Sequence, residues 1–165
     1  MTETTKHESV EKIAELIKDI RIAMLVTVDQ RRGARSRPMA TQDVPFDGTL
    51  WFFTSKDSAQ AEEIARDPRV NVAYSSPASE DYISLSGAAA VVDDRARMHE
   101  LWSAWVRPWF DGPDDPDLRL IRVDVEEAEY WSTRGGKVAS FVALVKGVIT
   151  GNAGDQNNEH ARVEL

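Results

Sequence analysis

Short segments rich in β-branched and aromatic residues recur along this chain, and this pattern constrains the fold more than any other feature. Such segments predict strands when turn-forming residues separate them. The expected strands are Ile22–Val28, Ala34–Thr41, Thr49–Thr54, Val70–Ser75, Tyr82–Val92, Leu118–Val125 and Ala128–Trp131. Most connections between them are of hairpin scale. We therefore expect a closed or nearly closed antiparallel barrel in preference to a doubly wound parallel sheet.

Helices are expected beside this sheet. Apolar residues between Val10 and Ile20 recur at helical spacing, with charged residues between them, which predicts an amphipathic first helix. A second, short helix is expected from Asp57 to about Ala65, with Asp57 as its N-cap and Gln60 answering as in a capping box. Two further helices are expected over residues 94–105 and 138–150.

The composition disfavours several classes of site and partner. The chain has no cysteine, so disulfides, thiolate catalysis and cysteine-ligated metal are excluded. Its formal charge of −8 disfavours nucleic acid, whose binding is dominated by phosphate neutralisation. No membrane span and no signal peptide are recognised. Together with the absence of cysteine, this makes a cytoplasmic location the simplest expectation. A single domain over residues 1–165 is expected, with residues 1–8 and 152–165 peripheral or flexible.

Two arginines lie two residues apart on an expected strand. Arg35 and Arg37 therefore project from the same face, because side chains of a strand alternate with a period of two. Two neighbouring guanidinium groups repel unless an anion lies between them or water surrounds them. The pair fits either a solvated strand face or a fork for phosphate, which arginine binds in a bidentate manner. Pro38 removes one ladder donor, which suggests an edge strand or a bulge.

Polar side chains gather where the third strand ends and the short helix begins. The segment Thr54–Gln60 supplies hydroxyl groups, one lysine and the unpaired N–H groups of a helix start. Together these groups favour an anion. Ordinary helix capping explains Asp57 and Ser58 equally well.

The chain contains five tryptophans. Trp102 and Trp105, three residues apart on one expected helix, are expected in the core or at an interface. Trp131 follows Tyr130 at a strand end and precedes two glycines. That position makes Trp131 a better candidate for stacking on a flat ligand.

Several common motifs are missing from the sequence. The three histidines are scattered and have no ligand-spaced partner, so no metal site is expected. No GxGxxG loop follows a strand and no Walker loop is present, which leaves Rossmann-type dinucleotide binding and NTP hydrolysis without support. No Ser-His-Asp set can be assembled with conviction.

Six segments follow one another in an order that is hard to obtain by accident. They are Ser36–Met39, Leu50–Thr54, Asp67–Val72, Tyr82–Gly87, Trp109–Pro116 and Ala128–Trp131. In that order they resemble the pyridoxamine-phosphate-oxidase-like superfamily, and most closely its general stress protein branch. The resemblance spans roughly Ile13–Thr150. It implies a mainly β fold with flanking helices, the antiparallel FMN-binding split β-barrel, and a homodimer that holds FMN, in preference to FAD, at the subunit interface.

The resemblance also implies a set of cofactor-binding residues. Arg37 is the implied phosphate-binding arginine, and the backbone of Met39 and the side chain of Gln42 would face the isoalloxazine ring. Phe53, Thr54 and Ser55 would line the ribityl chain, and Tyr82 and Trp131 would approach the ring from elsewhere in the dimer. The remaining implied residues, near the phosphate, are Lys56, Ser58 and Gln60.

The chain departs from the family pattern at Ala59 and Gln60. Relatives commonly carry a lysine here, and pyridoxamine-phosphate oxidases an Arg-Lys pair. One phosphate-binding charge is therefore missing, unless Lys56 replaces it. The C-terminal arginine and histidine arrangement of true pyridoxamine-phosphate oxidases is also missing, so vitamin B6 oxidation is not expected.

The implied function is that of a general-stress-type flavoprotein that passes electrons between a reduced pyridine nucleotide and a small acceptor. No residue is an evident acid or base, so no catalytic residue is assigned. The alternative is a non-catalytic module that stores, delivers or senses flavin during stress. A haem or deazaflavin ligand is disfavoured, because no histidine falls at the expected site and the acidic chain offers few basic residues for a polyglutamate tail.

Overall fold

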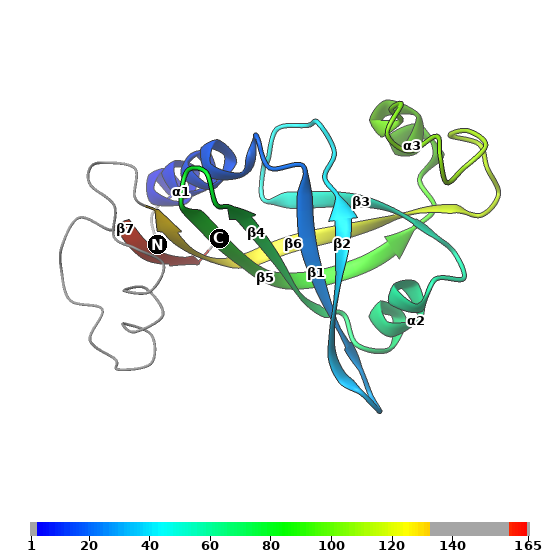
Figure 1. The fold of residues 1–165 in the computed structure, drawn as a ribbon, viewed down its shortest axis with the longest axis horizontal. Coiled ribbons are helices and arrows are strands. Elements are labelled where there is room, and N and C mark those ends of the chain that lie inside the picture. Colours follow the sequence, from blue (N-terminus) through cyan, green and yellow to red (C-terminus); the bar gives the residue numbers. More distant parts are fainter. Residues whose placement is uncertain (1–2, 133–158, 165) are drawn as a thin grey trace.

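The computed structural model describes residues 3–132 and 159–164, which form one curled antiparallel sheet with three helices beside it (Figure 1). In chain order, the elements are α1 (Glu3–Ile17), β1 (Ile22–Asp29), β2 (Gly33–Ala40), β3 (Thr49–Ser55), α2 (Ala59–Arg66), β4 (Arg69–Ser76), β5 (Asp81–Val92), α3 (Arg95–Leu101), β6 (Leu118–Ser132) and β7 (Glu159–Glu164).

The strand order is β2-β1-β4-β5-β6-β3, and β7 pairs with β6 beyond the end of β3. No ladder joins β2 to β3 in the described part, so the sheet curls without closing, and the split barrel expected from the sequence is confirmed. β2 lies at an edge of the sheet, which explains why Pro38 is tolerated there. No helix of the described part is long and apolar enough to cross a membrane.

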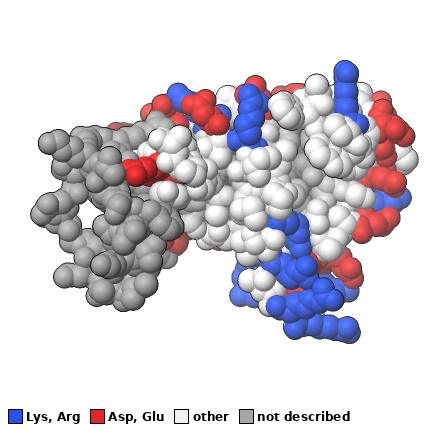
Figure 2. All heavy atoms as spheres, viewed as in Figure 1, with Lys and Arg blue, Asp and Glu red and all other residues white. Residues whose placement is uncertain are grey.

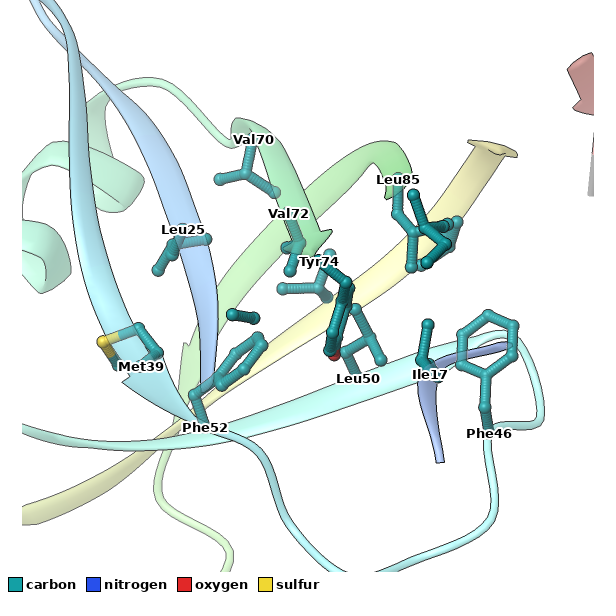
Figure 3. Close-up of a cluster of buried hydrophobic side chains, with 14 of the residues drawn as sticks. Ile17, Leu25, Met39, Phe46, Leu50, Phe52, Val70, Val72, Tyr74 and Leu85 are labelled. Atoms are coloured by element: carbon teal, nitrogen blue, oxygen red, sulfur yellow. The ribbon is translucent and has the colours of Figure 1, made fainter. Parts of the chain in front are cut away.

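Two hydrophobic clusters pack on opposite faces of β6. The main core lies inside the curl of the sheet (Figure 3), and α1 contributes Ile13, Leu16 and Ile17 to it. The second cluster lies under α3. Ile121 of β6 belongs to the main core, whereas its neighbour Leu120 belongs to the second cluster, because side chains alternate along the strand.

The residues Leu118–Trp131 form one continuous strand, and the expectation of two separate strands is wrong. The ladder between β5 and β6 instead contains a bulge, where the register shifts between Ser86 and Gly87. The backbone of β6 approaches very closely there: a Cβ atom added to Gly87 would lie 2.1 Å from the carbonyl oxygen of Asp124. A bulge interrupts the alternation of side chains without ending the strand. The sequence pattern therefore suggests two strands with a break between them.

Three further expectations about helices and strands need correction. α3 ends at Leu101 rather than near residue 105, and Trp105 is 68% exposed, so Trp105 is not in the core of this chain. The N-cap of α2 is Ser58 rather than Asp57, because the Ser58 hydroxyl accepts the Ala61 N–H. Part of the polar tail forms β7, which pairs with a stretch of β6 that β3 does not reach. The helix expected over residues 138–150 lies outside the described residues.

Candidate functional site

The short helix α2 organises the polar residues that the sequence assigns to a phosphate. Ser58 begins the helix, and the Asp67 N–H closes it by donating to the Glu63 carbonyl. One side of α2 is anchored in the main core through Ile64. Gln60 and Glu63 lie three residues apart and so are neighbours on one helix face.

Arg37 donates to two partners that lie inside the fold. Its Nη2 donates to Glu63 Oε2 at 2.8 Å, and its Nη1 donates to Thr27 Oγ1 at 2.6 Å. The Thr27 hydroxyl in turn donates to the same Glu63 oxygen at 2.5 Å. The Arg37 side chain is 18% exposed and that of Glu63 is 9% exposed, while Thr27 is fully buried. The three side chains therefore form a closed hydrogen-bonded triad between β1, β2 and α2.

The triad explains how the charge of one of the two neighbouring arginines is balanced. Arg35 and Arg37 do share the inward face of β2, and the charge of Arg37 is balanced by a carboxylate of the protein. A guanidinium carries more N–H groups than the two that the triad uses, so Arg37 keeps donors for an outside anion. The sequence did not identify Thr27 or Glu63. The only sequence feature that points to them is a polar residue at an inward-facing position, which is Thr27 on the strand and Glu63 on the helix.

A second polar cluster lies at the start of α2. The Thr54 and Ser58 hydroxyl oxygens are 2.8 Å apart, and Gln60 Nε2 donates to Thr54 Oγ1 at 3.0 Å. Thr54 is buried and lies on the core face of β3. The cluster offers hydroxyl and amide donors without a positive charge. It brings together three of the residues that the resemblance implied.

Lys56 is the nearest candidate for the missing charge, and it is already paired. Its Nζ lies 2.9 Å from Asp117 Oδ1, and its backbone N–H donates to the Asp117 carbonyl. The hydrogen bond to the Asp117 carboxylate raises the pKa of Lys56. The side chain is exposed, so an anion in water has to compete with Asp117 for this ammonium group.

Met39 and Gln42 continue the same edge of the sheet away from Arg37. Met39 is buried in the main core (Figure 3). Gln42 lines a cavity of about 440 Å³ that lies between α1, the segment 41–46 and β3. This volume falls within the range of small-molecule sites. Its floor includes the aromatic side chains of Phe46, Phe52 and Tyr74.

The remaining implied residues lie on the other face of the sheet. Phe53 packs edge-to-face on Trp102 in the second cluster, at 6.0 Å between ring centroids. Tyr82 and Trp131 are direct cross-strand partners on β5 and β6. Cross-strand partners share a face, and both neighbours of this pair along the strands, Ile83 and Tyr130, are buried in the main core. Tyr82 and Trp131 therefore point away from the face on which Arg37 lies.

The charges are unevenly distributed over the surface. Lysine and arginine side chains gather at the lower end of the molecule in Figure 2, where Figure 1 places the tip of the β1–β2 hairpin. The hairpin contributes Arg31, Arg32 and Arg35. The carboxylate of Asp29 accepts the backbone N–H groups of Arg31 and Arg32, which lowers the pKa of Asp29. Within the described residues, no group of three or more His, Cys, Asp or Glu side chains is placed to hold a metal ion.

The residues around α2 fit a flavin phosphate in donor chemistry. Arg37 offers a partly buried guanidinium with free N–H groups, and the neighbouring cluster offers hydroxyl and amide groups. The fold is a split barrel, and this donor set has the chemistry that an anion requires. A sequence model of the family described as pyridoxamine 5'-phosphate oxidase like matches residues 8–155, and the chain belongs to this family.

Individual relatives agree with this membership. General stress protein 26 of Bacillus subtilis is 30% identical over 121 residues, which cover 71% of this chain and 84% of that protein. Protein bli-3 of Neurospora crassa is 26% identical over 94% of this chain and 80% of that protein. Among solved structures, the general stress FMN/FAD binding protein from Xanthomonas citri is 32% identical. It has a TM-score of 0.68, and the match covers 82% of this chain and 96% of that one.

Proposed function

We propose that the protein binds a flavin, as FMN, and passes electrons between a reduced pyridine nucleotide and a small acceptor. The observation that carries the proposal is the donor set around α2 in a chain of this family: the Arg37 guanidinium bonds to Glu63 of this helix, and a cluster of hydroxyl and amide groups lies at the start of the same helix. The solved relative from Xanthomonas citri is itself described as an FMN/FAD binding protein. When bound, the flavin would supply the redox chemistry.

In this proposal, the residues of the chain bind and orient the cofactor. Arg37 donates to the phosphate, and the Thr54–Ser58–Gln60 cluster donates to the phosphate or to the ribityl hydroxyls. Met39 and Gln42 lie further along the same edge and would approach the ring. No described side chain is assigned an acid or base role, so proton exchange is left to solvent and to the substrates.

We further propose that the site is shared between two copies of the chain. Arg37 lies on the core face of the sheet, whereas Tyr82 and Trp131 lie on the outer face. A single flavin can contact both groups only if they come from different chains. A homodimer with the flavin at its interface meets this condition, and homo-oligomers with a two-fold axis are the commonest kind.

Spectroscopy on the purified protein tests this function. We expect a yellow protein whose extracted ligand has the mass of FMN. Under anaerobic conditions, NADH or NADPH should bleach the flavin absorption at a rate useful for turnover. If the flavin binds but neither nucleotide bleaches it, the protein is a storage, delivery or sensing module rather than an oxidoreductase. A protein that neither retains nor takes up FMN would refute the proposal.

A further inference from the structure

The Glu63 carboxylate lies where an anion is to be bound, and the proposed function gives it no role. Glu63 is buried, and its Oε2 contacts both the Arg37 guanidinium and the Thr27 hydroxyl. Its neighbour Glu62 differs in each respect: Glu62 is exposed and pairs with Arg66 on the surface of the same helix. Two adjacent acids of α2 thus have different environments, and only one of them touches the candidate phosphate site.

Anchoring α2 to the sheet does not explain why this contact is ionic. Taking a carboxylate and a guanidinium out of water is costly, and well-packed apolar residues of similar size often serve as well or better. The same helix already packs into the main core through Ile64. The ionic contact therefore calls for a reason beyond packing.

The charges around the phosphate end balance one another. Arg37 is paired with Glu63, and Lys56 is paired with Asp117. Gln60, in the place where the resemblance expects a lysine, is neutral and bonds to Thr54. Arg37 and Lys56 therefore each have a carboxylate partner, so these two pairs add no net positive charge.

We propose that Glu63 sets the affinity of the site for the flavin phosphate, an inference that rests on the proposed flavin-binding function. The carboxylate acts as a positioning residue, because with Thr27 it holds one edge of the Arg37 guanidinium and leaves the other donors to the ligand. It also opposes the phosphate through its negative charge. The site consequently discriminates little between phosphorylated and unphosphorylated flavins, and FMN exchanges readily.

The size of the repulsion between the Glu63 carboxylate and the flavin phosphate follows from Coulomb's law. Glu63 and a phosphate on the far side of the guanidinium would be separated by roughly 6 Å, where two charges still interact appreciably even at the dielectric constant of water. A phosphomonoester carries about two charges at neutral pH. Removing the charge of Glu63 should therefore tighten FMN by about five- to tenfold, and added salt should reduce this gain.

The variant Glu63→Gln tests the inference, because it removes the charge and keeps the size and a hydrogen-bonding oxygen. FMN and riboflavin are titrated into the full chain, freed of any flavin that copurifies, at low and high KCl. We expect the ratio of FMN to riboflavin affinity to rise about five- to tenfold, with the rise shrinking at high KCl. Riboflavin has no phosphate, so its own affinity should stay constant.

Two matched variants separate charge from shape. Glu62→Gln removes the same charge one residue away on the same helix, and Glu63→Asp keeps the charge while shortening the side chain. Both should leave the affinity ratio within about twofold of the wild type. An unchanged or lower ratio in Glu63→Gln, when the wild type binds both flavins, overturns the role of Glu63 and leaves the flavin-binding function intact. A wild type that binds neither flavin refutes the function itself, and the inference with it.

Discussion

At the scale of single residues, the Arg37 guanidinium is held by Thr27 and Glu63, and its other N–H groups have no hydrogen-bond partner among the residues that the structure describes. The contacts to Thr27 and Glu63 fix its orientation before any ligand arrives, so little side-chain entropy remains to be lost on binding. Arg35 lies one pleat nearer the hairpin tip and has no ion-pair partner among the described residues. The two arginines share a face of β2 but differ in how firmly the fold holds them.

This difference predicts that removing Arg37 lowers the affinity for FMN more than removing Arg35 does. Arg37→Ala alone would leave Glu63 buried without its partner, which costs about 3–5 kcal/mol of stability, so both substitutions are made in the Glu63→Gln background. Arg37→Ala should weaken FMN by about ten- to a hundredfold, because one charge-assisted contact to phosphate is lost. Arg35→Ala should weaken it by less than about threefold. Equal losses in FMN titrations would mean that the pair is a solvated strand face.

A substitution of Gln60 should have the opposite effect and raise the affinity for FMN at the same site. Gln60→Lys restores the cation that the family pattern places there, next to the Thr54 and Ser58 hydroxyls. FMN should bind about tenfold more tightly at low salt, and this gain should shrink as KCl is raised. Isothermal titration with riboflavin is the control. A riboflavin affinity that rises together with that of FMN would show that the added lysine does not act on the phosphate.

At the scale of elements, the bulge between β5 and β6 depends on Gly87. A Cβ atom there would lie 2.1 Å from the backbone oxygen of Asp124, so Gly87→Ala forces two paired strands apart. We expect it to lower the free energy of unfolding by about 1–3 kcal/mol. Gly112→Ala is the matched control, because its Cβ would meet nothing within 4 Å. Urea denaturation of both variants decides the matter, and equal stability would show that the strands adjust at no cost.

The local elements could be predicted because their signals are local. The β-branched residues of Ile22–Val28 and the polar turn that ends at Gly33 identify the β1–β2 hairpin, and an edge position accounts for Pro38. The triad could not be predicted, because it depends on how α2 docks onto β1 and β2. Glu63 and Arg37 are 26 residues apart, and no periodicity connects them. The pairing of β7 was missed for the same reason, since a polar segment becomes a strand only where an unpaired edge meets it.

At the scale of the whole molecule, the two faces of the sheet separate the proposed cofactor contacts. Arg37 pairs with Leu25, Leu25 with Val72 and Val72 with Leu85, so Arg37 belongs to the row of residues that faces the core. Trp131 pairs with Tyr82 on the opposite face. This opposite placement is the reason for proposing that Arg37 and Trp131 reach one flavin from different protomers.

The outer face of β1 has the character expected of a contact between copies of the chain. Ile22 and Met24 are 53% and 39% exposed there, although both are large and apolar. Next to them, Asn71 donates to the hydroxyls of Ser84 and Ser86, which satisfies polar groups without introducing charge. An obligate interface of this type typically buries about 2,000 Å² or more. Light scattering at micromolar concentration should therefore report a dimer, and a monomer would remove the basis for a shared site.

A shared site predicts that two defective chains can restore each other. One chain carries Arg37→Ala with Glu63→Gln, and the other carries Trp131→Ala, which alone should weaken FMN and relieve the quenching of flavin fluorescence. Each homodimer then has two damaged sites. In a heterodimer purified through two different tags, one site receives the intact Arg37 of one chain and the intact Trp131 of the other. The heterodimer should bind about one FMN per dimer with wild-type affinity, because a two-fold interface places both intact residues in one of its two sites. If Arg37 and Trp131 of the same chain formed each site, every site of the heterodimer would stay defective, and no tight FMN binding would appear in the titration.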